Sequence, residues 1–155
     1  MKKTVLTLAL LLTCLAGFAQ TAKDFVEKMK DIKGVEVMTI PKSMMSMAMS
    51  QVDDENAKKV LKNIDEVTIM QLDKPSAETL ETFRKGISEL TGNGYEAMMQ
   101  ANEEDESVNI IAKKNGDELV EVVISVEEKK EIAFIIIKGK FKEEDLKVLQ
   151  DNMVE

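Results

Sequence analysis

The sequence predicts an α+β domain in which a largely antiparallel sheet of about five to six strands packs on helices. Two observations support this prediction. In the first half of the chain, segments with the helical periodicity of apolar residues alternate with β-rich segments. In the second half, four β-rich segments follow one another before a final helix. Successive strands joined by short turns form antiparallel meanders, so we expect a C-terminal four-strand meander.

The first half of the chain is expected to contain four helices and two strands. In order they are a helix over 21–33, a strand over 35–40, a Met-rich helix over about 42–51, a short helix capped by Asp53 or Asp54, a strand over 66–72, and a long helix from Pro75-Ser76 to Gly92. Phe25, Val26 and Met29 share one face of the first helix. Pro41 ends the first strand, because proline lacks the N–H that a strand ladder needs.

The second half contains the strongest turn and core signals. Strands are expected over 95–101, 108–112, 119–124 and 132–137, followed by a closing helix over 141–153. Asn115-Gly116 predicts a type I′ hairpin turn, in which both central residues have positive φ. Strict alternation places Leu119 and Val122 on opposite faces of their strand. The run 132–137 is apolar on both faces, so we expect it at the centre of the sheet under helices.

The first 19 residues have the pattern of a secretory signal peptide. Lys2 and Lys3 precede an apolar run over 5–12, and Ala16-Gly17-Phe18-Ala19 precedes the polar Gln20. We therefore expect a signal peptide over 1–19 and a single domain over 20–155. The domain is expected to be periplasmic or extracellular, and soluble after cleavage. No later segment is apolar over a length that would span a bilayer.

Cys14 offers the alternative of a lipid anchor. Thr13 stands where a smaller residue is expected before a lipidated cysteine. The segment 15–18 would also begin the mature chain with apolar residues instead of a polar tether. Cleavage before Gln20 is therefore the preferred prediction.

The composition excludes several classes of chemistry. The chain has no histidine, and its one cysteine lies in the predicted leader, so Ser-His-Asp, Cys-His and histidine–metal sites are excluded. The net charge of −8 argues against binding to nucleic acid or anionic membranes, which require a basic surface. There is no glycine-rich phosphate loop, and the few aromatic residues do not suit a carboxylate glycosidase. We expect no enzymatic activity and no cofactor.

The sharpest local feature is a cluster of methionines at Met44, Met45, Met47 and Met49. Flexible Met side chains fill cores or adaptable contact surfaces. The apolar residues of this helix span roughly 200° of a helical wheel, more than one sheet face would cover. We interpret the cluster as a candidate contact surface for an unknown envelope protein or for self-association. The alternative is a small-ligand or Cu(I) module, because thioethers are soft metal ligands.

Several longer segments resemble one known family. They are the Met-rich helix after Pro41, the segments 61–69, 94–99 and 118–121, and the run 135–146 around Gly139. With the exported start, they resemble the domain-of-unknown-function family DUF4252 of small exported bacterial proteins, over nearly all of the mature chain. The resemblance implies a single exported domain with no established catalytic residues. Some members are associated with extracytoplasmic sigma-factor systems, so it also implies an accessory role in envelope sensing.

The predicted leader can be tested by mass. We expect cleavage between Ala19 and Gln20 to release a soluble chain that begins at Gln20. An intact-mass measurement on the protein recovered from cells that express the full chain would show this. A diacylglyceryl group on Cys14 would contradict the prediction and make the protein lipid-anchored.

Overall fold

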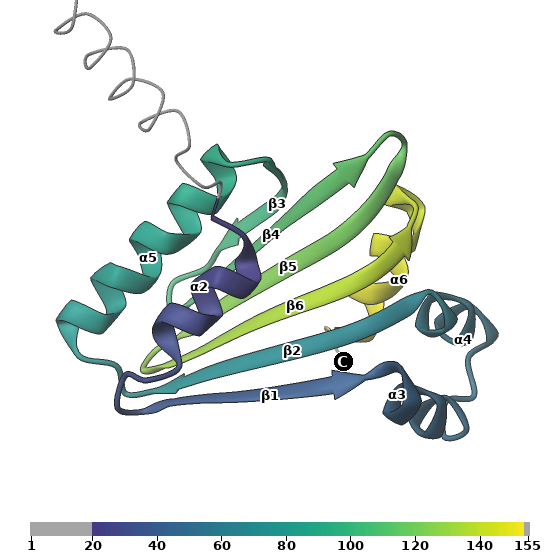
Figure 1. Ribbon diagram of the computed structural model, residues 1–155, viewed down its shortest axis with the longest axis horizontal. Coiled ribbons are helices and arrows are strands. Elements are labelled where there is room, and N and C mark those ends of the chain that lie inside the picture. The colour runs from purple at the N-terminus through teal and green to yellow at the C-terminus, as the bar shows by residue number, and fades with distance from the viewer. Residues whose placement is uncertain (1–19, 154–155) are drawn as a thin grey trace, which may run out of the picture.

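The computed structural model describes residues 20–153 and confirms the predicted α+β class. This part of the chain contains five helices and six strands (Figure 1). In order they are α2 (Ala22–Met29), β1 (Val35–Pro41), α3 (Lys42–Met49), α4 (Glu55–Lys62), β2 (Ile64–Asp73), α5 (Ala77–Gly92), β3 (Tyr95–Asn102), β4 (Glu106–Asn115), β5 (Glu118–Glu128), β6 (Glu131–Phe141) and α6 (Glu143–Met153). The predicted signal peptide, with Cys14, lies outside the described residues.

The six strands form one antiparallel sheet in the order β1-β2-β6-β5-β4-β3. The last four strands make the predicted meander, in which each strand pairs with the next in sequence. Helix α5 carries the chain from β2, near one edge, to β3 at the other edge (Figure 1). β6 lies inside the sheet between β2 and β5, which confirms the central place that its apolar sequence predicted.

One core lies between the sheet and helices α2 and α5, on the face toward the viewer in Figure 1, which we call the front face. At its centre Phe25 of α2, Phe83 of α5 and Phe134 of β6 pack with ring centroids 5.2 to 6.0 Å apart. All three side chains are buried. Edge-to-face aromatic pairs contribute about 0.5–1.5 kcal/mol beyond the burial of their area, so this triplet ties both helices to the central strand.

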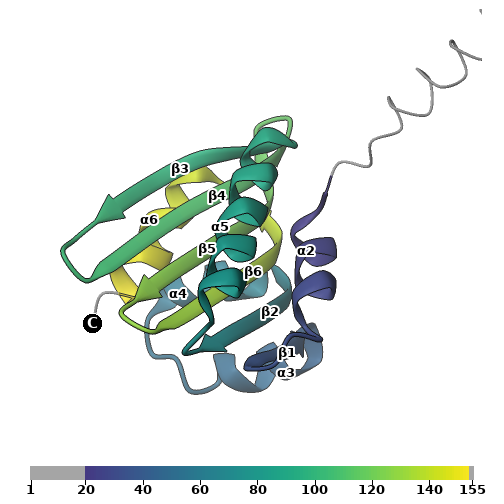
Figure 2. The ribbon, with the colours of Figure 1, turned by 90° about the vertical axis from the view of Figure 1, so that its left-hand side faces the viewer.

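A second core lies on the opposite, back face of the sheet, where α3, α4 and α6 pack. Figure 2 shows α6 and α4 on the side of the sheet away from α5 and α2. This core joins Met45 of α3 and Val60 of α4 to sheet residues that include Ile124 and Ile137. The half-buried Leu146 of α6 packs against it. The sheet is therefore the middle layer of three.

Side-chain caps begin three of the helices. Thr21 and Asp24 form a capping box, in which each side chain accepts the other residue's backbone N–H at 3.1 and 3.2 Å. Asp54, rather than Asp53, caps α4, and Ser76 caps α5. Each cap satisfies N–H groups that have no partner within the helix, and such a cap contributes about 1 kcal/mol.

The β4–β5 hairpin is present as expected, but the predicted type I′ turn is wrong. Asn115 pairs with Glu118 as the last step of the ladder, so Gly116 and Asp117 are the two central residues. Gly116 has a φ of +65°, whereas neither Asn115 nor Asp117 has a positive φ. Glycine at the first central position is the pattern of a type II′ turn. Asn115 thus keeps strand geometry and extends β4 by one residue.

A bulge in β5 also corrects the predicted faces of that strand. The register against β4 leaves Val120 without a counterpart between Leu119 and Glu121. One extra residue reverses the alternation of side chains beyond it. Leu119 therefore lies in the back-face core together with Val122, not on the opposite face as strict alternation predicted.

The contact between α2 and α5 depends on Gly86. A Cβ at this position would lie 2.1 Å from the Phe25 ring, whereas a Cβ at Gly92 of the same helix would meet nothing within 4 Å. We expect Gly86→Ala to lower the free energy of unfolding by about 1–3 kcal/mol through overpacking. Gly92→Ala is the matched control and should be neutral or stabilising by up to about 1 kcal/mol. Urea titration compares them, and equal stabilisation by both would contradict the close packing.

Candidate functional site

Helix α3 places its four methionines on two different sides. Met45 is buried in the back-face core, and Met49 is half-buried one turn further on. Met44 and Met47 are 56 % and 73 % exposed. Residues three or four apart share a side of a helix, so the pairs 44/47 and 45/49 lie on nearly opposite sides. The predicted candidate surface is thus divided between a core row and an exposed row.

This division bears on the Cu(I) alternative. A soft-metal site needs several sulfur ligands gathered around one point. Met45 packs within an apolar core, whereas Met44 and Met47 face outward. Helix α3 by itself therefore does not bring all four sulfurs together.

Strand β1 adds two exposed apolar side chains next to this helix. Val37 is 39 % exposed and Met38 is 55 % exposed, and β1 leads directly into α3. Successive side chains of a strand point to opposite faces of a sheet, so Val37 lies on the front face and Met38 on the back face of β1. We call Val37, Met38, Met44 and Met47 together, on both faces of this edge, the edge surface. Sequence reasoning missed its β1 part, because a strand of alternating apolar residues looks the same at the edge and in the interior of a sheet. In Figure 1 β1 is the outermost strand on one side, with α3 at its end.

The edge surface is electrically neutral on an acidic molecule. The segment 35–50 contains one acidic residue, Glu36, and one basic residue, Lys42, while the whole chain carries a net charge of −8. The Lys42 ammonium lies 3.0 Å from the Asp65 carboxylate, and both side chains are largely exposed. Such a pair contributes little to stability. Contact at this surface must therefore depend on apolar area and backbone groups.

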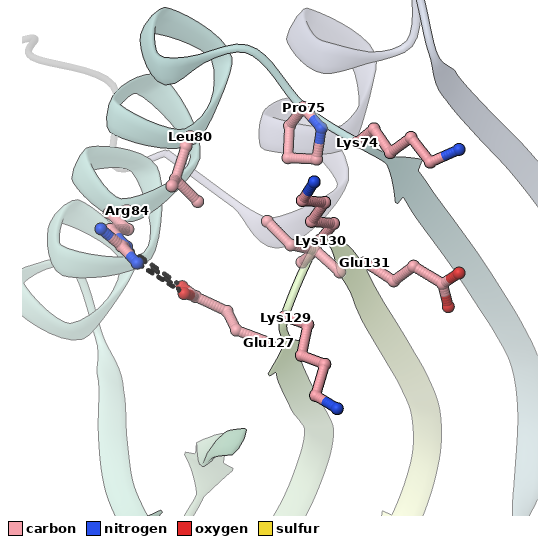
Figure 3. A pocket seen from close by; sticks show the side chains of 9 residues that line it. Lys74, Pro75, Leu80, Arg84, Glu127, Lys129, Lys130 and Glu131 are labelled. Atoms are coloured by element: carbon pink, nitrogen blue, oxygen red, sulfur yellow. Dashed lines mark hydrogen bonds and ion pairs between the residues drawn. The ribbon is translucent and has the colours of Figure 1, made fainter. Parts of the chain in front are cut away.

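A pocket of about 320 Å³ lies where the β5–β6 turn meets the start of α5 (Figure 3). Basic residues line it, including Lys74, Lys129 and Arg84, the single arginine of the chain. Arg84 donates to Glu127 at 2.9 Å, and this bond raises the pKa of the guanidinium above its ordinary value. Figure 3 shows the side chains of Lys74, Lys129 and Lys130 extending in different directions. Glu127 and Glu131 also line the pocket, so its lining carries both signs of charge.

Tyr95 forms the most enclosed polar contact of the front face. Its hydroxyl donates to the Glu121 carboxylate at 2.6 Å and accepts the Ala22 N–H at 3.0 Å. Burial raises the pKa of Tyr95 well above its ordinary value, and the hydrogen bond to Glu121 raises this pKa further. The phenol is therefore neutral at physiological pH. It anchors the first turn of α2 to the sheet and is poorly suited to proton transfer.

The described acidic residues do not assemble a metal site. In the acidic run 103–106, residues 103–105 form the β3–β4 turn and Glu106 begins β4; the Glu103 N–H donates to the Glu106 carbonyl at 2.8 Å. Within residues 20–153, no three acidic side chains gather closely enough to hold an ion. In the same range, no helix has the length and apolar character needed to cross a bilayer.

Comparison with known protein families identifies a match. A family model described as a domain of unknown function (DUF4252) matches residues 23–149, which is most of the chain. No curated protein and no solved structure matches the sequence. The matched range extends from α2 into α6, so it includes the edge surface, the back-face core and the front-face core except Ala22.

Replacing Tyr95 with Phe should change both stability and its pH dependence. At pH 7 the variant loses two hydrogen bonds of a buried group, at a cost of about 1–3 kcal/mol. The pKa of Tyr95 is higher in the folded state than in the unfolded chain, where tyrosine ionises near pH 10. The contribution of Tyr95 to the stability of the fold is therefore complete below about pH 10 and is lost as the pH rises toward the folded-state pKa. Tyr95 is the single tyrosine of the chain. Urea titrations from pH 7 to 11 should show the two proteins converging above pH 10, and a constant difference would contradict this account.

Proposed function

The chain belongs to the DUF4252 family, whose function is unknown, and we propose that it is an exported, non-enzymatic domain that acts through protein–protein contact in the cell envelope. The proposed contact site is the edge surface. A further part of the proposal is an accessory role in envelope sensing, which rests on the family resemblance. The proposed export rests on the leader-like sequence over 1–19. The non-enzymatic role rests on the lack of histidine and on the single cysteine within that leader.

One observation carries the proposal of a contact site. The large apolar side chains that the structure exposes in its described residues all lie between positions 37 and 47. Single exposed apolar residues are common, but a concentration of them in one segment is typical of an interaction surface. Three of the four are methionines, whose flexible side chains adapt to a partner. The buried Met45 holds the same helix against the sheet, so the exposed row has a fixed support.

The test separates the exposed row of α3 from its buried row. We expect the double variant Met44→Ser/Met47→Ser to keep its stability within about 0.5 kcal/mol, since both side chains are exposed, and to lose association. Met45→Ser should instead lower the free energy of unfolding by about 2–5 kcal/mol, because it empties part of a core. Lys85→Ser/Glu89→Ser is the surface control: both residues are exposed on α5, and the double change leaves net charge unaltered.

Association is measured by capture of proteins from the envelope extract of the source cells, followed by titration of each captured protein with the purified chain. We expect the parent chain and the α5 control to bind with equal affinity and the double methionine variant to bind at least tenfold more weakly. Equal binding by all three proteins would overturn the assignment of the contact site. Stabilisation of the parent by Cu(I), absent from the double variant, would favour the metal-binding alternative instead.

A further inference from the structure

We propose that the occupant of the edge surface is a second copy of this chain, joined by antiparallel pairing of β1 with β1 of that copy. This inference rests on the proposed function, because it names the partner chemistry for the same surface. It follows from three features of β1: an unprotected backbone edge, the direction of its hydrogen-bonding groups, and its complementarity to itself.

The first feature is that the two edges of the sheet are not equivalent. β1 pairs with β2 through an unbroken register over its whole length, with no bulge. β3, at the other edge, has a register shift between Ala97 and Met99 and leads into the acidic run 103–106. Bulges and charges are the usual devices that prevent a strand edge from pairing with another chain. β3 has such a bulge and an acidic turn beside it, whereas β1 has neither; within the strands themselves each carries one charge, Glu96 in β3 and Glu36 in β1.

The second feature is the direction of the backbone groups of β1. The Asp73 N–H donates to the Gly34 carbonyl at 3.2 Å, so the even-numbered residues of this segment direct their backbone toward β2. Alternation then directs the N–H and C=O groups of Val37 and Thr39 to the outer side. The Val35 N–H already donates to Ile32. Val37 and Thr39 are therefore the residues through which a further strand would pair most completely.

The third feature is that the outer side of β1 is complementary to the same side of a second copy. When a twofold axis perpendicular to the sheet passes beside Met38, Val37 faces Thr39 of the second copy, and the pair exchanges both backbone hydrogen bonds. Met38 then faces Met38 of the copy in a non-hydrogen-bonded pair, with Cα atoms about 4.5 Å apart. Glu36 faces Ile40, so no like charges are opposed. This arrangement is an isologous interface that joins the two sheets into one.

Charge favours a second copy at this surface over a cationic partner. Two chains of net charge −8 repel each other. The segment 35–50 has no net charge, so two copies can approach each other through it with little electrostatic repulsion. A basic partner would be drawn to the acidic surfaces elsewhere. The neutral, apolar character of Val37, Met38, Met44 and Met47 thus matches a copy of itself.

Proline substitution tests the backbone pairing. Thr39→Pro removes an outward N–H from an edge strand, a position where proline is tolerated, so the variant should fold and yet fail to dimerise. Met38→Pro removes an N–H directed at β2 and should instead impair folding. Sedimentation equilibrium of the full chain should show a concentration-dependent dimer for the parent. For Thr39→Pro with native circular dichroism, the dissociation constant should rise at least tenfold.

Cysteine cross-linking tests the register. In a chain with Cys14→Ser, Met38→Cys should form a disulfide-linked dimer on oxidation with diamide, because Cα atoms about 4.5 Å apart permit a disulfide. Glu36→Cys is the matched control on the same face and strand. In the proposed dimer the two cysteines at position 36 would lie four residues apart along the strands, about 13 Å, which is too far for a disulfide.

Either of two results would overturn the inference: a parent chain that is monomeric at all concentrations tested, or a Thr39→Pro variant that is folded and still dimeric. Equal cross-linking of Met38→Cys and Glu36→Cys would also contradict the register. If the parent chain is monomeric, and Met44→Ser/Met47→Ser nevertheless abolishes binding of an envelope protein, only the proposal that the partner is a second copy would be overturned. In that case the proposed contact function would stand.

Discussion

Burial of β6 on both of its faces is the constraint on which the rest of the structure depends. Phe134 and Ile136 point into the front-face core, while Ile137 lies in the back-face core. A strand that is apolar on both faces is stable only when helices cover both sides of the sheet. This requirement places α2 and α5 on one side and α3, α4 and α6 on the other. It also places β6 inside the sheet, between β2 and β5.

The three-layer arrangement explains why one edge of the molecule remains open. Helix α5 crosses the front face to connect β2 with β3, so the far edge belongs to the meander. The near edge is left to β1, and α3 follows it immediately because Pro41 ends the strand. Met45 binds this helix to the core, which leaves Met44 and Met47 exposed beside β1. The edge surface is therefore a consequence of how the core is covered.

Helix α2, at the start of the domain, is fixed to the sheet by several contacts. The Thr21–Asp24 capping box and the Tyr95 hydroxyl satisfy the first N–H groups of α2, and Phe25 joins that helix to β6. These contacts involve none of the residues of the edge surface. Substitutions at the exposed methionines can therefore change association without loosening the domain.

The sequence by itself determined the elements that depend on local chemistry. The double apolar face of 132–137, a cap at Asp53 or Asp54, the start of the long helix at Pro75-Ser76 and the chain reversal near Gly116 could all be predicted, because each depends on neighbouring residues. The tertiary structure alone decided that β1 is an edge strand, that Val120 bulges, and that Tyr95 meets Ala22. It also decided which methionines of α3 are buried and which are exposed. These features depend on pairings between residues far apart in the chain, and strand order has no local signature because edge and inner strands share the same alternation of side chains.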